Sequence, residues 1–384
     1  MLSGILIYYI LGITFFTLGL QEWIVTKRAF LRDGIYRKKW SIYTYLLLFL
    51  FVLISSLRYR TGVDCESYVY DYLHWNPNDV DDKWELFYVG IVEGLRSIGA
   101  GRVLFLGVLA ALEIVPFYYA LKTRKFLYAY IGLILMVGPF YLNWMNGIRQ
   151  CIAACFFVLA SVVLVDKWKN RRLVAALIII LAAQFHTSAY VLLAFLFIPA
   201  ERDLFKNRIL NIAILIVCAV LGQSEFIKDS LGFITAIEHA DFYSNYNLDL
   251  VMADERTMTF GPRRIVIFLL CLIVLWYAPQ MKRYFNDKFF IYSFNLFFIN
   301  ECFGDNLLSN VSHVLRRPFL YTQPFELICF AYFFYYISRC YKGKYKNLVY
   351  IFSIILICSY IFIQCYADAP LKGESSLFKF YLGQ

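Results

Sequence analysis

The chain has 384 residues, of which 61% are hydrophobic, 20% aromatic and only 17% charged, and its formal net charge is +10. Soluble domains are about 45–50% apolar and about 25% charged, so this composition excludes a soluble enzyme, a disordered protein and a typical nucleic-acid-binding protein. The composition instead predicts an all-helical protein that crosses a membrane many times, and the positive charge has to be interpreted together with the bilayer.

Apolar stretches follow one another along the whole chain. A helix needs roughly 20 apolar residues to cross the hydrocarbon core of a bilayer. The stretch 84–99 is only moderately apolar and carries three charged side chains, which predicts an interfacial or re-entrant amphipathic helix. The predicted spanning stretches lie near residues 4–25, 41–57, 103–121, 126–142, 150–165, 173–198, 209–223, 264–280, 289–303, 319–338 and 347–366.

The charged loops between these stretches predict their orientation, because short cytoplasmic loops collect Lys and Arg. One set of six loops carries a net charge of +18, and the remaining segments outside the spans carry −4. Four glutamates within spans carry a further −4, which gives the total of +10. We therefore expect the basic set on the cytoplasmic side. Those loops are 26–40, 122–125, 166–172, 201–208, 282–288 and 339–346.

Two inner loops flank the stretch 173–198, so this stretch must go out and return. It predicts a hairpin of two short helices with His186 at the outer tip. Twelve crossings follow, with both termini outside. We expect a single transmembrane domain over residues 1–384, with large outer loops at 58–102 and 224–263, and no cleavable signal peptide, because the basic cluster follows the first span.

Motifs of soluble enzymes are missing from the sequence. There is no P-loop, no GxGxxG after a strand, no GxSxG and no HExxH. Ten cysteines are scattered singly and only four histidines are present, so no metal-ligand spacing and no disulfide framework is apparent. We expect neither a metal nor another cofactor. The four glutamates within spans are expected to pair with arginines or polar groups between helices.

Polar and ionisable side chains gather at the outer ends of the predicted spans. Such groups are costly at membrane depth and are usually retained for function. Positive charge is also disfavoured on the outer side, because Lys and Arg collect in cytoplasmic loops. The candidate site residues are Arg58, Arg60, Asp64, Tyr68, Arg149, His186, Arg263, Arg264, His313, Arg316 and Arg317.

Arginines in a water-poor outer cavity suit a phosphate or diphosphate ligand. The planar guanidinium forms bidentate bonds with phosphate and stays charged. A diphosphate leaving group needs its developing charge neutralised in the transition state. Asp64 or His186 has the chemistry to remove a proton from an attacking hydroxyl. These residue types together predict transfer from a lipid-linked diphosphate, with Arg149 among the catalytic groups.

Structural interpretations of the same residues remain open. The arginines of the two large outer loops can extend toward lipid headgroups, and Arg149 can contact a lipid phosphate at the start of its helix. The segment that begins at His186 can cap the second half-helix. Asp64 can be a turn residue after Gly62.

Three short segments resemble one family of membrane enzymes. Arg58-Tyr59-Arg60-Thr61-Gly62-Val63-Asp64, followed by Tyr68, resembles the R-x-x-x-G-x-D-x-x-x-Y opening of the first large loop in the EpsG/Wzy-like polysaccharide polymerases. Residues 146–150 resemble the N-x-I-R-Q segment of that family, and residues 182–189 resemble its A-x-x-F-H-x-S-A segment. The order and spacing agree over roughly residues 40–200.

The resemblance implies a glycosyltransferase with a GT-C-like membrane fold at the outer face of the bacterial inner membrane. Its substrates would be oligosaccharide repeat units on undecaprenyl diphosphate, as in O-antigen, lipopolysaccharide, capsule or exopolysaccharide synthesis, and no metal or nucleotide sugar would be needed. A polysaccharide chain-length regulator would be a further partner. The implied roles place Arg149 and Arg316 or Arg317 on the diphosphate, with Asp64 or His186 as base.

Three other functions compete with this interpretation. A transporter or flippase of lipid-linked glycans would need a cavity that opens to both faces, often with pseudosymmetric repeats, and we see no repeat. A glycan ligase would use nearly the same chemistry as a polymerase. An acyltransferase would need a catalytic histidine nearer the cytoplasmic side.

Overall fold

The computed structural model describes residues 2–34, 36, 38–76, 85–166, 169–225, 227, 261–309, 313–368 and 375–381. Within these residues the chain is helical and forms no strand; a single antiparallel bridge joins Arg58 to Phe380. Most of the predicted outer loop at 224–263 lies outside the described residues.

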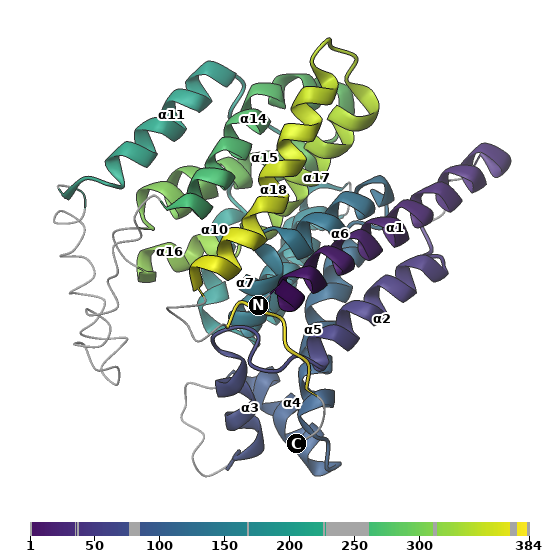
Figure 1. The fold of residues 1–384 in the computed structure, drawn as a ribbon, viewed down its shortest axis with the longest axis vertical. Helices are drawn as coiled ribbons and strands as arrows, with labels where there is room; N and C mark the ends of the chain where they lie inside the picture. The colour runs from purple at the N-terminus through teal and green to yellow at the C-terminus, as the bar shows by residue number, and fades with distance from the viewer. Residues whose placement is uncertain are drawn as a thin grey trace.

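The first half of the chain forms helices on one side of the molecule, in purple and blue in Figure 1. The long helices α1 and α2 lie side by side, and the short helices α3 and α4 project at the lower end. The elements are α1 (Leu2–Asp33), α2 (Ile42–Ser56), α3 (Cys65–Leu73), α4 (Leu86–Ser97), α5 (Arg102–Ala120), η2 (Lys125–Leu127), α6 (Tyr128–Val137), α7 (Phe140–Asn146), α8 (Ile148–Val165) and α9 (Arg171–Ala183).

The second half packs against the first around α17, the most buried helix. Every residue from Gln323 to Phe334 is buried, as expected for a helix that is apolar on all sides. Helix α11 lies at the edge opposite α1 (Figure 1). The elements are η3 (Thr187–Val191), α10 (Leu192–Phe195), α11 (Arg208–Leu221), α14 (Pro262–Phe285), α15 (Lys288–Ile299), the π-helix η4 (Asn300–Leu307), α16 (His313–Leu320), α17 (Gln323–Tyr335), the π-helix η5 (Tyr336–Cys340) and α18 (Lys346–Asp368).

Five of the described helices are long and apolar enough to cross a membrane. The helices α6 and α7 make a sixth if they form one span, and they meet at a bend of 67°. Pro139 explains the bend, because proline pushes the preceding residue out of helical geometry, and Gly138 is extended with ψ −164°. The chain is therefore an all-helical, polytopic membrane protein.

The helices lie where hydropathy predicts them. Helix α4 lies within the predicted amphipathic stretch 84–99, and the stretch 173–198 breaks in its middle as expected. Helix α9 ends at Ala183, and His186 has an extended backbone with φ −158° and ψ 110°. The 13 residues of α9 extend about 20 Å at 1.5 Å per residue, which is shorter than the roughly 30 Å hydrocarbon core.

The C-terminal segment 375–381 runs back along the loop that follows α2. The Tyr59 N–H donates to the Lys379 carbonyl at 2.9 Å, and the Gly62 N–H donates to the Ser375 carbonyl at 2.8 Å. The Thr61 hydroxyl donates to the Leu377 carbonyl at 3.2 Å and accepts from the Lys379 N–H at 3.0 Å. The first motif is thus held by residues more than 300 positions away in the sequence.

Candidate functional site

Glu85 joins two of the predicted site residues. Its Oε2 accepts a hydrogen bond from Arg149 Nη1 at 2.5 Å, and its Oε1 lies 3.1 Å from His186 Nδ1. The Thr187 N–H also donates to Oε1, at 3.0 Å. The Glu85 carboxylate is buried and directly precedes α4, so the start of one short helix places a negative charge between the start of α8 and the hairpin tip.

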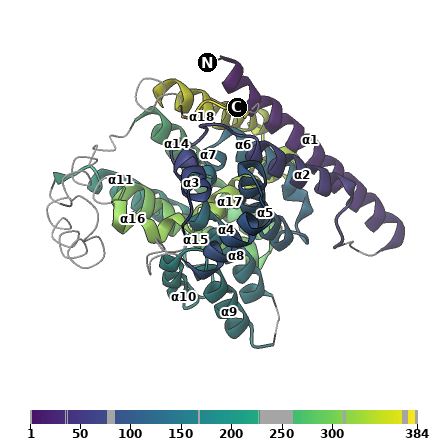
Figure 2. The same cartoon turned by 90° about the horizontal axis from the view of Figure 1, so that it is seen from below.

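The backbone and two phenylalanines fix α4 against that tip. The Phe87 N–H donates to the Gln184 carbonyl at 3.1 Å. The rings of Phe87 and Phe185 make an edge contact with centroids 5.6 Å apart, and Phe185 stacks on Phe156 of α8 at 5.8 Å. Viewed from below, α3 and α4 lie over the middle of the helix bundle (Figure 2).

Arg149 sits at the positive end of a helix. It is the second residue of the 18-residue α8, whose N-terminus carries a partial positive charge from the aligned peptide dipoles. A second positive charge there is unfavourable without an anion, and helix N-termini are ready-made anion sites. The Glu85 carboxylate supplies the anion in this structure. The Arg149 guanidinium also lies 5.0 Å from the centroid of the Tyr88 ring, in cation–π range.

Tyr68 completes the aromatic wall beside Arg149. Its ring and that of Tyr88 lie edge to face, with centroids 6.5 Å apart. Burial raises the pKa of Tyr68, and the charge of Arg149 opposes that shift. Tyr68, a candidate binding residue from the first motif, therefore lies close to Arg149 of the second motif.

The Glu85 carboxyl is ionised at neutral pH. Burial raises its pKa, but the hydrogen bond from His186, the charge of Arg149 and the Thr187 N–H together lower the pKa below the ordinary value of 4.5. An ionised carboxylate only accepts hydrogen bonds. His186 must therefore donate from Nδ1, and in the neutral imidazole this leaves Nε2 as the unprotonated nitrogen.

Further polar contacts extend this site toward α16 and α17. The hydroxyls of Ser188 and Tyr321 share a hydrogen bond of 2.7 Å. Gln150 Nε2 donates to the carbonyl of Arg317 at 3.1 Å. The second motif, through Gln150, thus contacts the backbone of α16 at Arg317, and the third motif, through Ser188, contacts Tyr321 just after α16.

Arg316 and Arg264 belong to a second charged cluster, centred on Asp305 of the π-helix η4. Arg316 Nη2 lies 2.6 Å from Asp305 Oδ1, and Arg264 Nη1 lies 3.9 Å from Asp305 Oδ2. Arg264 Nη2 also lies 3.3 Å from Glu301 Oε2. Carboxylates neutralise both arginines here. The Glu301–Arg264 pair agrees with the expectation for glutamates within spans, whereas the sequence did not indicate the Asp305–Arg316 pair.

Arg58 departs from both interpretations made for it. Its side chain is only 1% exposed, so it neither extends to lipid headgroups nor faces a solvent-exposed site. Nη1 donates to the Ser55 carbonyl at 3.2 Å and lies 2.6 Å from the Met145 sulfur. Arg58, the first residue of the first motif, therefore packs in the core.

The remaining candidates lie around these two clusters. Arg60 is exposed and stacks on its neighbour Tyr59, and Asp64 is exposed at the start of α3. Arg263 hydrogen-bonds to Gln364 of α18. His313 begins α16, and its side chain lies outside the described residues.

The glycine of the first motif has a physical requirement. Gly62 has φ +92°, a conformation that side-chain-bearing residues rarely adopt. A Cβ at this position would lie 2.7 Å from the Oδ1 atom of Asn146, in the second motif. The glycine thus permits the close approach of the first and second motifs.

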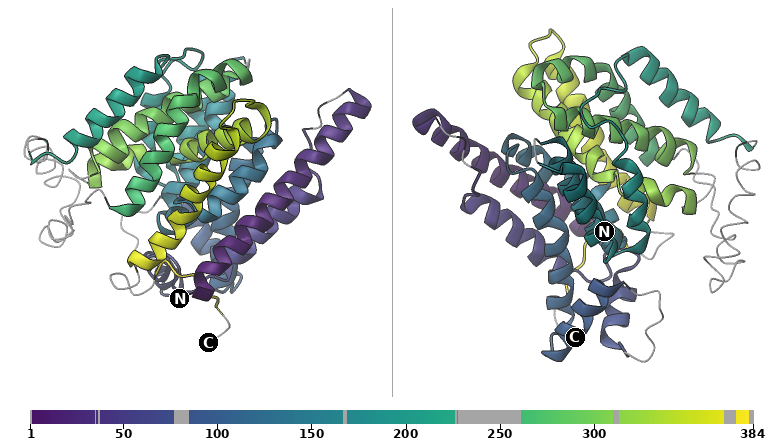
Figure 3. Two further views of the ribbon diagram at one scale, coloured as in Figure 1. Left: turned by 45° about the horizontal axis from the view of Figure 1, so that its top comes forward. Right: turned by 180° about the vertical axis from the view of Figure 1, so that it is seen from behind.

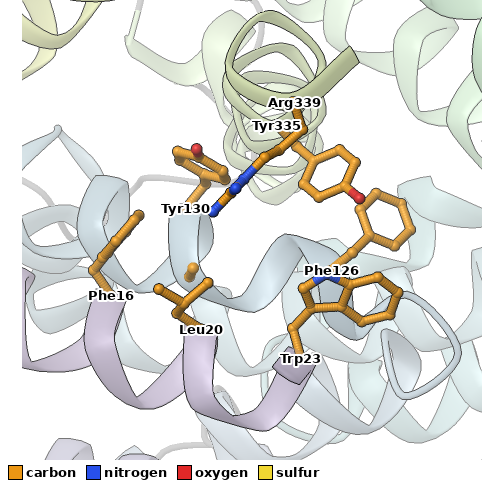
Figure 4. Close-up of a pocket in the computed structure, with 8 residues that line it drawn as sticks. Phe16, Leu20, Trp23, Phe126, Tyr130, Tyr335 and Arg339 are labelled. Atoms are coloured by element: carbon orange, nitrogen blue, oxygen red, sulfur yellow. The ribbon is translucent and has the colours of Figure 1, made fainter. Parts of the chain in front are cut away.

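Two hollows lie elsewhere. A crevice of about 20 Å³, with Trp23, Tyr130 and Arg339 among its lining residues (Figure 4), has room for one water. A groove of about 610 Å³ is lined by apolar side chains of α11, α14 and α18. The residues that line these hollows do not include Glu85 or its partners.

The fold and site together define a polytopic helical membrane protein whose charged residues converge at helix ends. The chain belongs to the EpsG family: the model of that family matches residues 41–381. This membership confirms the family resemblance of the three motifs and indicates a polysaccharide polymerase role in polysaccharide biosynthesis. No curated protein and no solved structure matches the chain.

Glu85 and Asp305 are the residues that sequence reasoning missed. Glu85 was noted only as one of three charges on an amphipathic stretch, and Asp305 only as part of an outer turn. A carboxylate directly before an apolar helix in an outer loop was the available signal for Glu85. Nothing local linked either carboxylate to an arginine, because the Glu85–Arg149 pair is separated by 64 residues and the Arg316–Asp305 pair by 11.

Proposed function

We propose that this protein polymerises oligosaccharide repeat units carried on undecaprenyl diphosphate. The growing glycan would be transferred from its lipid diphosphate to the non-reducing-end hydroxyl of another lipid-linked unit. The observation that carries the proposal is the Arg149–Glu85–His186 arrangement, within a chain of the EpsG family.

His186 acts as the general base in this mechanism. Because Glu85 holds the Nδ1 proton, Nε2 is free to accept the proton of the acceptor hydroxyl as its oxygen bonds to the sugar. This division of labour resembles the carboxylate–histidine pairs of hydrolases. Asp64, the alternative base, is exposed at the start of α3, whereas His186 is half-buried and oriented by Glu85.

Arg149 stabilises the diphosphate that leaves. Its guanidinium and the N-terminus of α8 both attract an anion, so the developing negative charge would be met by groups already in place. Glu85 keeps Arg149 oriented before substrate arrives. Arg317, whose charge acts on Tyr321 beside the third motif, would add a second positive charge. Arginine then supplies the charge that a metal ion provides in other transferases.

The proposed topology has twelve crossings, a GT-C-like arrangement and both termini outside, with the site at the outer face of the bacterial inner membrane. The charge difference between the two sets of loops supports it. So does the meeting of the loop before α4, the start of α8 and the hairpin tip, because all three were assigned to the outer side.

Reconstitution with a purified undecaprenyl-diphosphate repeat unit tests the proposal. Wild-type protein should give a ladder of products, and the Arg149→Ala and His186→Ala variants should lose it by at least about 100-fold, the usual scale for a general base or charge stabiliser. Glu93→Gln, on the exposed side of α4, is the matched control. A normal ladder from either site variant would overturn these roles.

The same assay separates the competing functions. A glycan ligase would attach single units or finished polymer to a second acceptor without lengthening chains. A flippase would move the lipid-linked unit across vesicles without forming any glycosidic bond. An acyltransferase would modify the unit only when an acyl donor is supplied.

A further inference from the structure

A buried group of potential ligands lies next to the Asp305 cluster. Cys271 of α14, Glu301 of η4 and Glu326 of α17 each place one ligand atom within 4.8 Å of the other two. All three residues are at least 96% buried. They come from elements far apart in the sequence, so the arrangement is a property of the packed fold.

The two glutamates are incompletely satisfied. Glu301 Oε1 and Glu326 Oε1 are buried, and neither has a hydrogen-bond partner among the described residues. Buried carboxylate oxygens are normally paired or coordinated, because removing them from water is costly. Two such oxygens in one cluster indicate that a positively charged ion binds there.

The charges around the cluster do not balance. Glu301, Asp305 and Glu326 face two arginines, Arg264 and Arg316, which leaves one negative charge in excess when all are ionised. Binding of a divalent cation with loss of the Cys271 thiol proton to solvent would bring the sum to zero. A single proton shared by the two glutamates would also balance the charge, and this alternative is separated from metal binding by the experiment below.

The ligand types favour a particular cation. Zinc accepts cysteine sulfur at about 2.3 Å and carboxylate oxygen at about 2.0–2.2 Å, commonly in tetrahedral geometry. A hard cation such as magnesium would prefer oxygen ligands alone. Glu301 also lies in a π-helix, a conformation found frequently at functional sites.

We propose that Cys271, Glu301 and Glu326 bind one zinc-type divalent cation that ties α14, η4 and α17 together. One metal–sulfur bond and two metal–oxygen bonds form, a water molecule takes the fourth position, and the thiol proton leaves to solvent. Glu301 then bridges the cation and Arg264, which holds the second charged cluster in place. This role is structural and does not depend on the glycosyl transfer.

Cobalt binding to the purified full-length protein tests the site. After treatment with a chelator, the wild type should bind one equivalent of Co²⁺ and show thiolate-to-cobalt absorption in the near ultraviolet. Cys271→Ser should lose that absorption, and Glu326→Gln should weaken binding at least tenfold. Cys365→Ser is the matched control, since this buried cysteine of α18 hydrogen-bonds to the Ser376 carbonyl of the C-terminal segment.

Three results would overturn the site. The first is the absence of saturable binding of one equivalent of cobalt, and the second is an absorption band that persists in Cys271→Ser. The third is a higher melting temperature of Glu326→Gln without bound cobalt, which would show that a shared proton balances the charge. Should Cys271→Ser fail to accumulate, Glu326→Gln decides alone. The readout involves no glycan, so it is independent of the outcome for polymerase activity.

Discussion

At the scale of single residues, Glu85 organises the site. Its buried carboxylate hydrogen-bonds to the Arg149 guanidinium and keeps the proton of the His186 imidazole on Nδ1. The carboxylate stays ionised because these partners lower its pKa by more than burial raises it. Removing one partner of such a group leaves the others buried and unpaired, which costs more than the pair itself contributes.

Replacing Glu85 with glutamine should make stability less dependent on pH. Because the folded-state pKa of Glu85 lies below its ordinary value of 4.5, its charge stabilises the protein fully above that pH, and the contribution disappears as the pH falls through the folded pKa. At pH 7 we expect Glu85→Gln to lower the melting temperature of detergent-purified protein, and the difference from wild type to shrink below pH 4. A difference that grows on acidification would contradict this assignment.

Replacing Gly62 with alanine should loosen the contact between the first two motifs. The added Cβ meets Asn146 Oδ1, and the positive φ strains any side chain, so we expect a loss of about 1–2 kcal/mol. Thermal melts and the glycan ladder measure the effect. Gly90→Ala is the control: its Cβ would contact nothing within 4 Å, and alanine in a helix should be neutral or stabilising by up to about 1 kcal/mol. Equal effects at both positions would argue against the contact.

At the scale of elements, the site depends on short segments that are held in place by hydrogen bonds to distant parts of the chain. Helix α4 is placed by a backbone bond to the hairpin tip, and the loop after α2 is held by the C-terminal segment 375–381. Backbone N–H and carbonyl groups of irregular segments need partners when they leave water. The pairing between residues 57–62 and this segment satisfies several of them at once.

Thr61→Val should release the C-terminal segment. Valine has nearly the shape of threonine but lacks the hydroxyl that joins the Leu377 carbonyl and the Lys379 N–H, and leaving buried groups unpaired costs about 1–3 kcal/mol. We expect faster protease cleavage in the segment 375–381 and a weaker glycan ladder.

Thr14→Val serves as the comparison for that change. The Thr14 hydroxyl bonds only to the Ile10 carbonyl of its own helix, so its removal should have little effect. If both variants were equally resistant to protease, the segment would not depend on Thr61.

At the scale of the whole molecule, the bundle buries some charges in pairs and leaves apolar surface outside. Glu22 pairs with Lys125 at 2.8 Å, and Glu301 pairs with Arg264. Glu113 and Glu326 instead have buried carboxylate oxygens without a hydrogen-bond partner among the described residues. Exposed large apolar side chains, such as Ile13 at 63% and Phe49 at 60%, lie on the outer helices α1 and α2 (Figure 3). In a membrane this surface faces lipid, where it costs nothing.

Alkaline phosphatase fusions test the proposed orientation. The enzyme is active only after export, so a fusion at the C-terminus should be active, whereas fusions after Lys169 and after Lys344 in the basic loops should be inactive. The physical reason is the retention of Lys- and Arg-rich loops on the cytoplasmic side. Activity after Lys344 would contradict both the orientation and the number of crossings.

The sequence by itself determined the fold class, the helix positions and the break at His186. These follow from local composition, since roughly 20 apolar residues in a row form a helix in lipid and a polar break interrupts it. The three motifs also indicated the family. All of this information lies within short windows of the chain.

Only the tertiary structure decided which charges meet. It buried Arg58, paired Arg149 with Glu85 and Arg316 with Asp305, and gathered Cys271, Glu301 and Glu326 from three elements. The physical reason is that the strength of an ion pair depends on the distance between the groups and on the burial of both. For side chains brought together by packing, neither quantity exists until the chain has folded.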